Sequence, residues 1–169
     1  MRKLMLLLSM TFIGSFMLTS AVSAAPLPLK PAIVKRVIDT YTLEVTSERI
    51  TEQVRLLNLA PPLQARPTDL RKIEEIAADQ DLTQLTGKTV FLEFDDQVRD
   101  EENRLLAYVW LKKPKTGGID EMISQMLNAK LLLLGYAEWC PINPNYKYTG
   151  ELLSMETDAY FAKRGVWGK

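Results

Sequence analysis

The segment Ile33–Val45, with the sequence IVKRVIDTYTLEV, is rich in valine, isoleucine, threonine and tyrosine. This composition is typical of β structure, and the segment predicts one strand or a bent pair of strands. The next apolar segment, Ile50–Leu59, predicts another strand. Pro61 and Pro62 end it, because proline has no N–H to donate to a neighbouring strand. The fold therefore begins with β structure.

Two further strands are predicted near the middle of the chain. Thr89–Asp95 follows a turn at Gly87–Lys88 and alternates apolar with polar residues. Leu105–Leu111 follows a charged hairpin at Asp96–Asn103. With the bent pair at the start, these segments make five strands in total.

Helical spacing of apolar residues predicts three helices, over Thr68–Asp81, Ile119–Leu134 and Gly150–Arg164. Gly135 and Gly165 are the glycines that end the last two. Strands and helices do not alternate as in βαβ units. The pattern predicts a mainly β, α+β fold in which a small five-stranded barrel carries about three helices.

The length of 169 residues predicts one domain, and the composition, 47% hydrophobic and 25% charged, is that of a globular protein. The chain has no histidine, which excludes Ser-His and Cys-His nucleophile pairs and imidazole metal sites. Its single cysteine, Cys140, excludes an intramolecular disulfide. Any chemistry must therefore use carboxylates, arginine, lysine, tyrosine or a hard cation.

Residues 1–24 have the pattern of a secretory signal peptide: two basic residues, the apolar run Leu4–Leu18 and a small-residue cleavage site at Ala24. The alternative is an uncleaved membrane anchor. We expect a secreted protein with an extended lead-in at 25–32, a folded domain at 33–169 and no membrane span after cleavage. Cleavage leaves 19 of the 21 basic residues against 21 acidic ones, a net charge of −2, so the protein has no global attraction for polyanions. We expect a monomer.

A series of sequence pieces occurs in one order along the chain: Val37–Leu43 (VIDTYTL), Val54–Leu57 (VRLL), Asp100–Trp110 (DEENRLLAYVW), Leu133–Ala137 (LLGYA), Asn143–Asn145 (NPN) and Met155–Trp167. In this order the pieces resemble the thermonuclease, or staphylococcal nuclease-like, family. The resemblance covers about Ile33 to Trp167 and implies a five-stranded OB barrel with three helices. It also implies calcium-dependent hydrolysis of DNA and RNA.

The resemblance implies that Arg55 and Arg104 stand where the family's two phosphate-binding arginines belong. A guanidinium matches a phosphate bidentately, which suits that role. Asn103 replaces a turn glycine, and asparagine tolerates the left-handed conformation. Asp39 is the one carboxylate retained near the family's ion. Arg55, Arg104 and Asp39 are therefore the candidate ligand-binding residues, and the two arginines are catalytic only if the family site is used.

The other acidic residues of the family pattern are absent. By the same resemblance, Tyr41 stands where one metal-binding aspartate belongs, Ala60 where the second belongs and Leu63 where the catalytic glutamate belongs. Calcium takes about six to eight oxygen ligands, so no metal ligands are assigned and no cofactor is expected. The interpretation is a degenerate nuclease site on a non-catalytic module that binds an anionic, protein or glycan ligand. The alternative is a divergent Ca²⁺-dependent nuclease with relocated carboxylates, such as Asp39, Asp95 or Asp96.

Structural interpretations of the same residues stay open at this point. Arg55 is either a phosphate ligand or a solvated arginine of the barrel. Arg104 is either a ligand or an ion-paired surface residue, because the acidic loop 95–102 surrounds it. That loop would repel a nucleic-acid backbone, so nucleic acid is a disfavoured partner. Trp139 and Cys140 are expected to be packing residues. If a ligand site exists, both arginines should face one concave surface beside Asp39.

Overall fold

The computed structural model describes residues 29–63 and 82–168. The predicted signal peptide and the predicted helix at Thr68–Asp81 lie outside the described residues. In the described part, no helix is long and apolar enough to cross a membrane.

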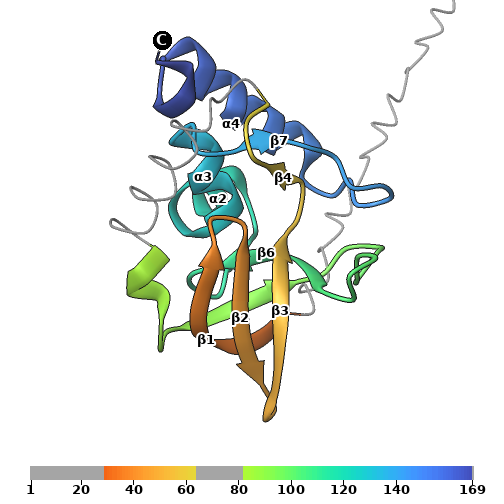
Figure 1. Ribbon diagram of the computed structural model, residues 1–169. Helices are drawn as coiled ribbons and strands as arrows, with labels where there is room; N and C mark the ends of the chain where they lie inside the picture. The colour runs from red at the N-terminus through yellow and green to blue at the C-terminus, as the bar shows by residue number, and fades with distance from the viewer. Residues whose placement is uncertain (1–28, 64–81, 169) are drawn as a thin grey trace, which may run out of the picture.

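Five strands form a closed barrel in the order β1-β2-β3-β6-β5 (Figure 1). Neighbouring strands are antiparallel except β3 and β6, which are parallel. The predicted mainly β, α+β fold with a five-stranded OB-type barrel is confirmed. The strands are β1 (Leu29–Asp39), β2 (Thr42–Ser47), β3 (Ile50–Leu56), β5 (Thr89–Glu93) and β6 (Leu105–Trp110).

Strand β1 is long because it pairs with two neighbouring strands. Its first half, from Leu29 to Ile33, pairs with β5, and the rest, to Asp39, pairs with β2. The strand therefore takes in the last four residues of the expected lead-in 25–32. The segment Ile33–Val45 is the bent pair, since β1 and β2 meet in a turn at Thr40–Tyr41.

Strand β6 is buried at every position, because the barrel interior covers one face and helices cover the other. One link is Asn128 of helix α3 (Leu127–Leu133), which is itself completely buried. Its amide donates to the Leu57 carbonyl at 3.0 Å, and its Oδ1 accepts the Val109 N–H at 3.0 Å. This pair of hydrogen bonds fixes α3 on β6 and the end of β3.

The predicted helix at Ile119–Leu134 is wrong as one element, because the structure divides it into α2 (Ile119–Gln125) and α3. Met126 between them has extended dihedral angles, φ −94° and ψ 121°. It forms a β-bridge with Trp110, and the Leu111 N–H donates to the Gln125 carbonyl. The Met126 N–H still donates to the Met122 carbonyl, but the Gln125 carbonyl is bonded to the end of β6. Pairing with β6 therefore interrupts the helix at this point, which apolar spacing does not reveal.

The last helix, α4 (Thr149–Phe161), lies at the end of the molecule opposite the β2–β3 turn (Figure 1). It ends three residues before the predicted Arg164, and a short 3₁₀ turn, η3 (Gly165–Trp167), follows it. Another short 3₁₀ turn, η2 (Thr83–Leu85), precedes β5. Between the barrel and α4, two short strands, β4 (Leu59–Ala60) and β7 (Glu138–Trp139), pair with each other.

Two glycines meet behind α3. Gly135 has φ +69° and ends the helix as predicted, and Gly165 has φ +54°. A Cβ on Gly135 would lie 2.3 Å from the Arg164 carbonyl oxygen, and one on Gly165 would lie 2.3 Å from the Gly135 carbonyl oxygen. The two turns can approach this closely only because neither residue has a side chain.

A buried carboxylate, Glu93, joins the barrel to the start of α4. It accepts hydrogen bonds from Trp110 Nε1 at 2.6 Å and from the Tyr148 hydroxyl at 3.0 Å, and it pairs with Lys147. Burial, followed by the Glu93 charge, raises the pKa of Tyr148, which keeps its hydroxyl a donor. We call Glu93, Trp110, Lys147 and Tyr148 the Glu93 cluster.

Candidate functional site

Arg55 lies on β3, on the barrel surface, where β2 and β6 flank the strand. Its register partners are Thr42 and Leu106, and its side chain is half-buried. Nη2 donates to the Leu59 carbonyl at 2.9 Å, and the guanidinium lies 5.1 Å from the centre of the Tyr41 ring. Arg55 is therefore held between a carbonyl and an aromatic face instead of extending into solvent.

The charges around Arg55 show which candidate residues come together. Burial lowers its pKa, and Arg104 lowers it as well, whereas Asp39 and Asp100 raise it. The strand register supports this grouping. Thr42 pairs with both Asp39 and Arg55, and the pair Val54–Leu105 lies next to Arg55 and Arg104 in the sequence. The three candidates therefore lie in one region of the surface. The charged form of the Arg55 guanidinium is less stable at this site than in water, so a bound anion would stabilise it.

Arg104 precedes β6 and is ion-paired within its own loop. Nε lies 2.7 Å from Asp100 Oδ2, and Nη1 lies 3.0 Å from Glu102 Oε2. The Asp100 side chain is 18% exposed, and its Oδ1 also accepts the N–H groups of Glu102 and Arg104. The Glu102 side chain is 71% exposed. Asp100 thus shapes the turn, while Glu102 covers Arg104 from the solvent side.

Partial burial alone would raise the pKa of Asp100, but the hydrogen bonds and charge of Arg104 outweigh burial and lower it. The turn also needs Asn103, whose φ of 60° is in the left-handed region. Asparagine adopts this conformation more readily than most residues, as the sequence suggested.

Asp39 and Tyr41 form the turn between β1 and β2. Asp39 Oδ1 accepts the Tyr41 N–H at 2.7 Å, a local bond that stabilises the turn. Tyr41 is buried, and its hydroxyl donates to the Tyr136 carbonyl at 2.7 Å. The Tyr41 ring therefore fills the space beside Arg55 and ties the turn to the residues after α3.

Ala60 and Leu63 lie near a carboxylate that the sequence analysis did not select. Ala60 pairs with Glu138 in the β4–β7 sheet, and Glu138 Oε2 accepts the Leu63 N–H at 2.7 Å. The Leu63 side chain itself is 88% exposed. No local signal in the sequence points to Glu138, because its position depends on a two-residue pairing between segments far apart in the chain.

The remaining residues considered in the sequence, two aspartates, Trp139 and Cys140, do not join Arg55 and Arg104. Asp95 Oδ2 accepts the Lys147 N–H at 3.0 Å and the Tyr108 hydroxyl at 3.2 Å, and Asp96 is exposed. Trp139 packs against the core, as expected. The expectation that Cys140 is a packing residue is wrong, because its thiol is exposed and free.

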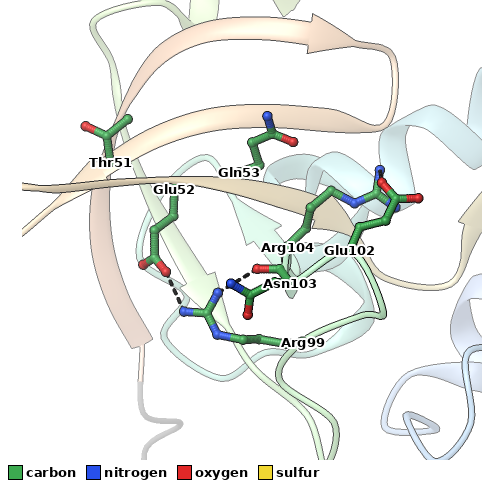
Figure 2. A pocket seen from close by; sticks show the side chains of 7 residues that line it. All are labelled: Thr51, Glu52, Gln53, Arg99, Glu102, Asn103 and Arg104. Carbon is green, nitrogen blue, oxygen red and sulfur yellow. Dashed lines mark hydrogen bonds and ion pairs between the residues drawn. The ribbon is translucent and has the colours of Figure 1, made fainter.

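A pocket of about 300 Å³ opens beside Arg104 (Figure 2). Gln53 and Thr51 project from one side of β3, and Glu52 turns to the other side, toward Arg99. Arg99 pairs with Glu52 and donates to the Asn103 carbonyl at 2.7 Å. The lining residues are Thr51, Glu52, Gln53, Arg99, Glu102, Asn103 and Arg104.

Carboxylates do not gather into a metal site in the part of the chain that the structure describes. Over residues 29–63 and 82–168, no group of three or more His, Cys, Asp or Glu residues is close enough to hold an ion. What gathers instead is a pair of guanidinium groups with acidic side chains around them. Chemically, this arrangement suits recognition of an anion.

Comparison with known proteins gives two kinds of match. Residues 53–169 match the protein family described as "Staphylococcal nuclease homologue", a segment that includes both Arg55 and Arg104. The thermonuclease of Staphylococcus hyicus is 32% identical over 133 residues, which cover 78% of this chain and 72% of that protein. The thermonuclease of Staphylococcus intermedius is 30% identical over 136 residues, covering 80% of this chain and 74% of that protein.

Proposed function

The chain belongs to the staphylococcal nuclease family, and we propose that it is a secreted member that binds an anionic ligand without hydrolysing phosphodiesters. Arg55 and Arg104 are the ligand-binding residues in this proposal. The observation that carries it is the register of β3 and β6, which brings Arg55 and Arg104 together on the barrel surface, while Tyr41 and Ala60 stand where the family has metal-binding carboxylates.

The calcium ion implied by the family does not fit the residues present. Calcium takes about six to eight oxygen ligands and favours carboxylates. The Tyr41 hydroxyl is already bonded to a carbonyl, and the side chain of Ala60 has no oxygen. Asp39 remains, but one of its oxygens holds the turn. These contacts support a site that works without the ion.

Hydrolysis would also need a group that activates water. A side-chain general base contributes about 10²–10⁴-fold to a rate, and the family's glutamate position holds Leu63 here. Arginine stays protonated and cannot accept the proton. The two arginines can bind a phosphate and offset its charge, which is binding chemistry.

Arg104 is available for an anion because Glu102 is a weak, replaceable partner. Its side chain is mostly exposed, and Arg104 is its only side-chain partner among the described residues. An exposed ion pair contributes about 0–1 kcal/mol, whereas a charge-assisted bidentate contact with phosphate is stronger. A phosphate can therefore replace Glu102 while Asp100 still orients Arg104.

The test is a calorimetric titration of the mature protein with inorganic phosphate and with a single-stranded DNA oligonucleotide. Arg104→Gln should lower the affinity for phosphate at least about tenfold, because it removes charged hydrogen bonds. Arg36→Gln is the matched control, since Arg36 is an exposed, ion-paired arginine of β1. Equal affinities in the two variants would contradict the proposal.

A nuclease assay with added Ca²⁺ and with EDTA decides between this proposal and the alternative of a divergent nuclease. Glu138 is the observation that favours the alternative, because it places a carboxylate beside Ala60 and Leu63. Hydrolysis that depends on calcium and is lost in Glu138→Gln, but not in Glu151→Gln on α4, would establish the alternative and overturn the non-catalytic proposal.

Secretion belongs to the same proposal and rests on the N-terminal sequence pattern. Mass spectrometry of the protein recovered outside the cells should find an N-terminus at Ala25. A chain that keeps residues 1–24 and stays with the membrane fraction would show an anchor instead.

A further inference from the structure

The pocket in Figure 2 continues directly from Arg104 along strand β3. Strands β3 and β6 are parallel, and Val54 pairs with Leu105. Gln53 and Arg104 each precede one member of that pair, so they are neighbours across the two strands. Arg55 follows two residues after Gln53, on the same face of β3. A ligand anchored on the two arginines can therefore extend into the pocket.

Two amide side chains in the pocket have unused hydrogen-bonding capacity. The side chains of Gln53 and Asn103 form no hydrogen bond with any residue that the structure describes, and both are exposed. Each amide offers one acceptor and two donors. Such groups bind hydroxyls well, because a hydroxyl both donates and accepts.

The charged residues of the pocket make it unfavourable for a second anion. Arg99 is paired with Glu52, and Arg104 with Glu102, so each cation has a carboxylate next to it. A second phosphate here would meet Glu52 and Glu102 without a free cation of the pocket to offset them. The part of the ligand that enters the pocket should therefore be neutral.

The pocket also has no aromatic surface on which a nucleobase can stack. None of its seven lining residues is aromatic. Proteins that bind single-stranded nucleic acid combine a positive groove with aromatic stacking, and this pocket provides neither. Its volume of about 300 Å³ is at the lower end of the range for small-ligand sites and suits a single sugar unit.

We propose that this pocket binds the neutral, hydroxyl-rich part of a sugar phosphate whose phosphate lies on Arg55 and Arg104. The inference rests on the proposed anion-binding function and names its ligand class. The phosphate replaces Glu102 at Arg104, and the amides of Gln53 and Asn103 bind the sugar hydroxyls. The ligand is thus a phosphate monoester of a sugar or polyol and not a nucleic-acid strand.

The experiment compares three probes on the mature protein: inorganic phosphate, glucose 1-phosphate and an oligothymidylate. Glucose 1-phosphate should bind about tenfold more tightly than inorganic phosphate, because a few neutral hydrogen bonds are added. Oligothymidylate should bind no more tightly than inorganic phosphate.

Three variants locate the effect. Gln53→Ala and Asn103→Gly should each reduce the advantage of glucose 1-phosphate to about threefold or less and leave the affinity for inorganic phosphate unchanged. Glycine suits position 103, whose φ is 60°. Gln84→Ala, in η2, is the control for loss of an exposed amide and should keep the full advantage.

The outcomes separate this inference from the function on which it rests. Equal affinities for glucose 1-phosphate and inorganic phosphate, with both reduced by Arg104→Gln, would overturn the sugar site and leave the anion site intact. Tighter binding of oligothymidylate would overturn the ligand class. Failure of all three probes to bind would overturn both proposals.

Discussion

Two of the ion-paired regions of this barrel, around Glu93 and around Arg104, differ in how far along the chain their partners lie. Glu93 is fully buried, and its partners Trp110 and Tyr148 lie 17 and 55 residues away. Arg104, by contrast, is paired with Asp100 and Glu102, which lie in its own loop. The first set joins the barrel to α4, and the second joins a loop only to itself.

This difference separates the roles of the two regions. Removing Glu93 leaves buried donors without an acceptor, so the contact contributes to the stability of the whole domain. Removing Glu102 leaves Arg104 in contact with water and Asp100, so the loop can exchange one anion for another. Ion pairs formed within a loop are therefore where ligand binding is expected, and pairs between distant elements are where stability is expected.

The largest effect should come from Glu93→Ala. We expect a loss of about 3–5 kcal/mol in the free energy of unfolding, because Trp110 and Tyr148 lose their buried acceptor and Lys147 loses its partner. Urea denaturation of the variant and the parent measures the difference. A loss under about 1 kcal/mol would mean that the Glu93 cluster is no more important for stability than the exposed loop.

Tyr41→Phe should have the next largest effect. Its hydroxyl donates to the Tyr136 carbonyl, and losing that bond should cost about 1–2 kcal/mol, while the phenyl ring still packs beside Arg55. Tyr160→Phe, on the exposed side of α4, is the control and should leave the unfolding midpoint in urea unchanged. If both variants unfold at the same urea concentration, the Tyr41 hydroxyl contributes no more to stability than the exposed ion pair of Arg104 with Glu102.

Asp100→Asn should cost about 1 kcal/mol at neutral pH, through loss of the charge that pairs with Arg104. The folded protein lowers the pKa of Asp100 below its ordinary value of 3.8. The stabilisation is therefore complete above that value and is lost as the pH falls through the lower, folded-state pKa. Unfolding measured from pH 7 to pH 2 should show the two proteins converging in acid. A difference that persists at pH 2 would exclude this cause.

Glu102→Gln should change the free energy of unfolding by less than about 0.5 kcal/mol, since the pair is exposed. It should raise the affinity for inorganic phosphate about two- to fivefold, because the competing carboxylate is removed. Glu101→Gln removes the same charge from the same loop without removing a partner of Arg104. If Glu101→Gln raises the affinity equally, net charge and not Glu102 controls the site.

Calcium should have the smallest effect, a shift in melting temperature under about 1 °C at millimolar concentration. An ion bound only to the folded protein at 100 times its Kd would add about 2.7 kcal/mol, which is several degrees for a domain of this size. Differential scanning calorimetry with Ca²⁺ and with EDTA measures the shift. A reproducible rise of several degrees would show a calcium site that the residues beside Asp39 do not predict.

The barrel strands were predictable from sequence because their signals are local. Val54 and Leu56 alternate with polar neighbours and are buried in β3. In β5, Val90 and Leu92 are buried two residues apart, as the period of a strand requires. The two-residue strands β4 and β7 were not predictable, because neither has enough residues to show a period. The break at Met126 was missed for a related reason, since a bridge to Trp110 causes it.

The candidate site was partly predictable in the same way. The resemblance identified Arg55, Arg104 and Asp39, and the acidic residues next to Arg104 in sequence suggested its ion pairs. The packing of Tyr41 beside Arg55 and the approach of Glu138 to Leu63 depend on contacts between distant segments. Contacts of this kind cannot be read from the local pattern of a single sequence.

The meeting of Gly135 and Gly165 has a consequence for how the chain is made. The whole of helix α4 lies between Gly135 and Gly165 in the sequence, so the turn after α3 lacks its partner until α4 and Gly165 have also been synthesised. A nascent chain in which Gly165 is still inside the ribosome cannot form this contact. For a protein exported as we propose, this packing step is postponed until α4 has emerged, and the precursor stays incompletely packed while export requires an open chain.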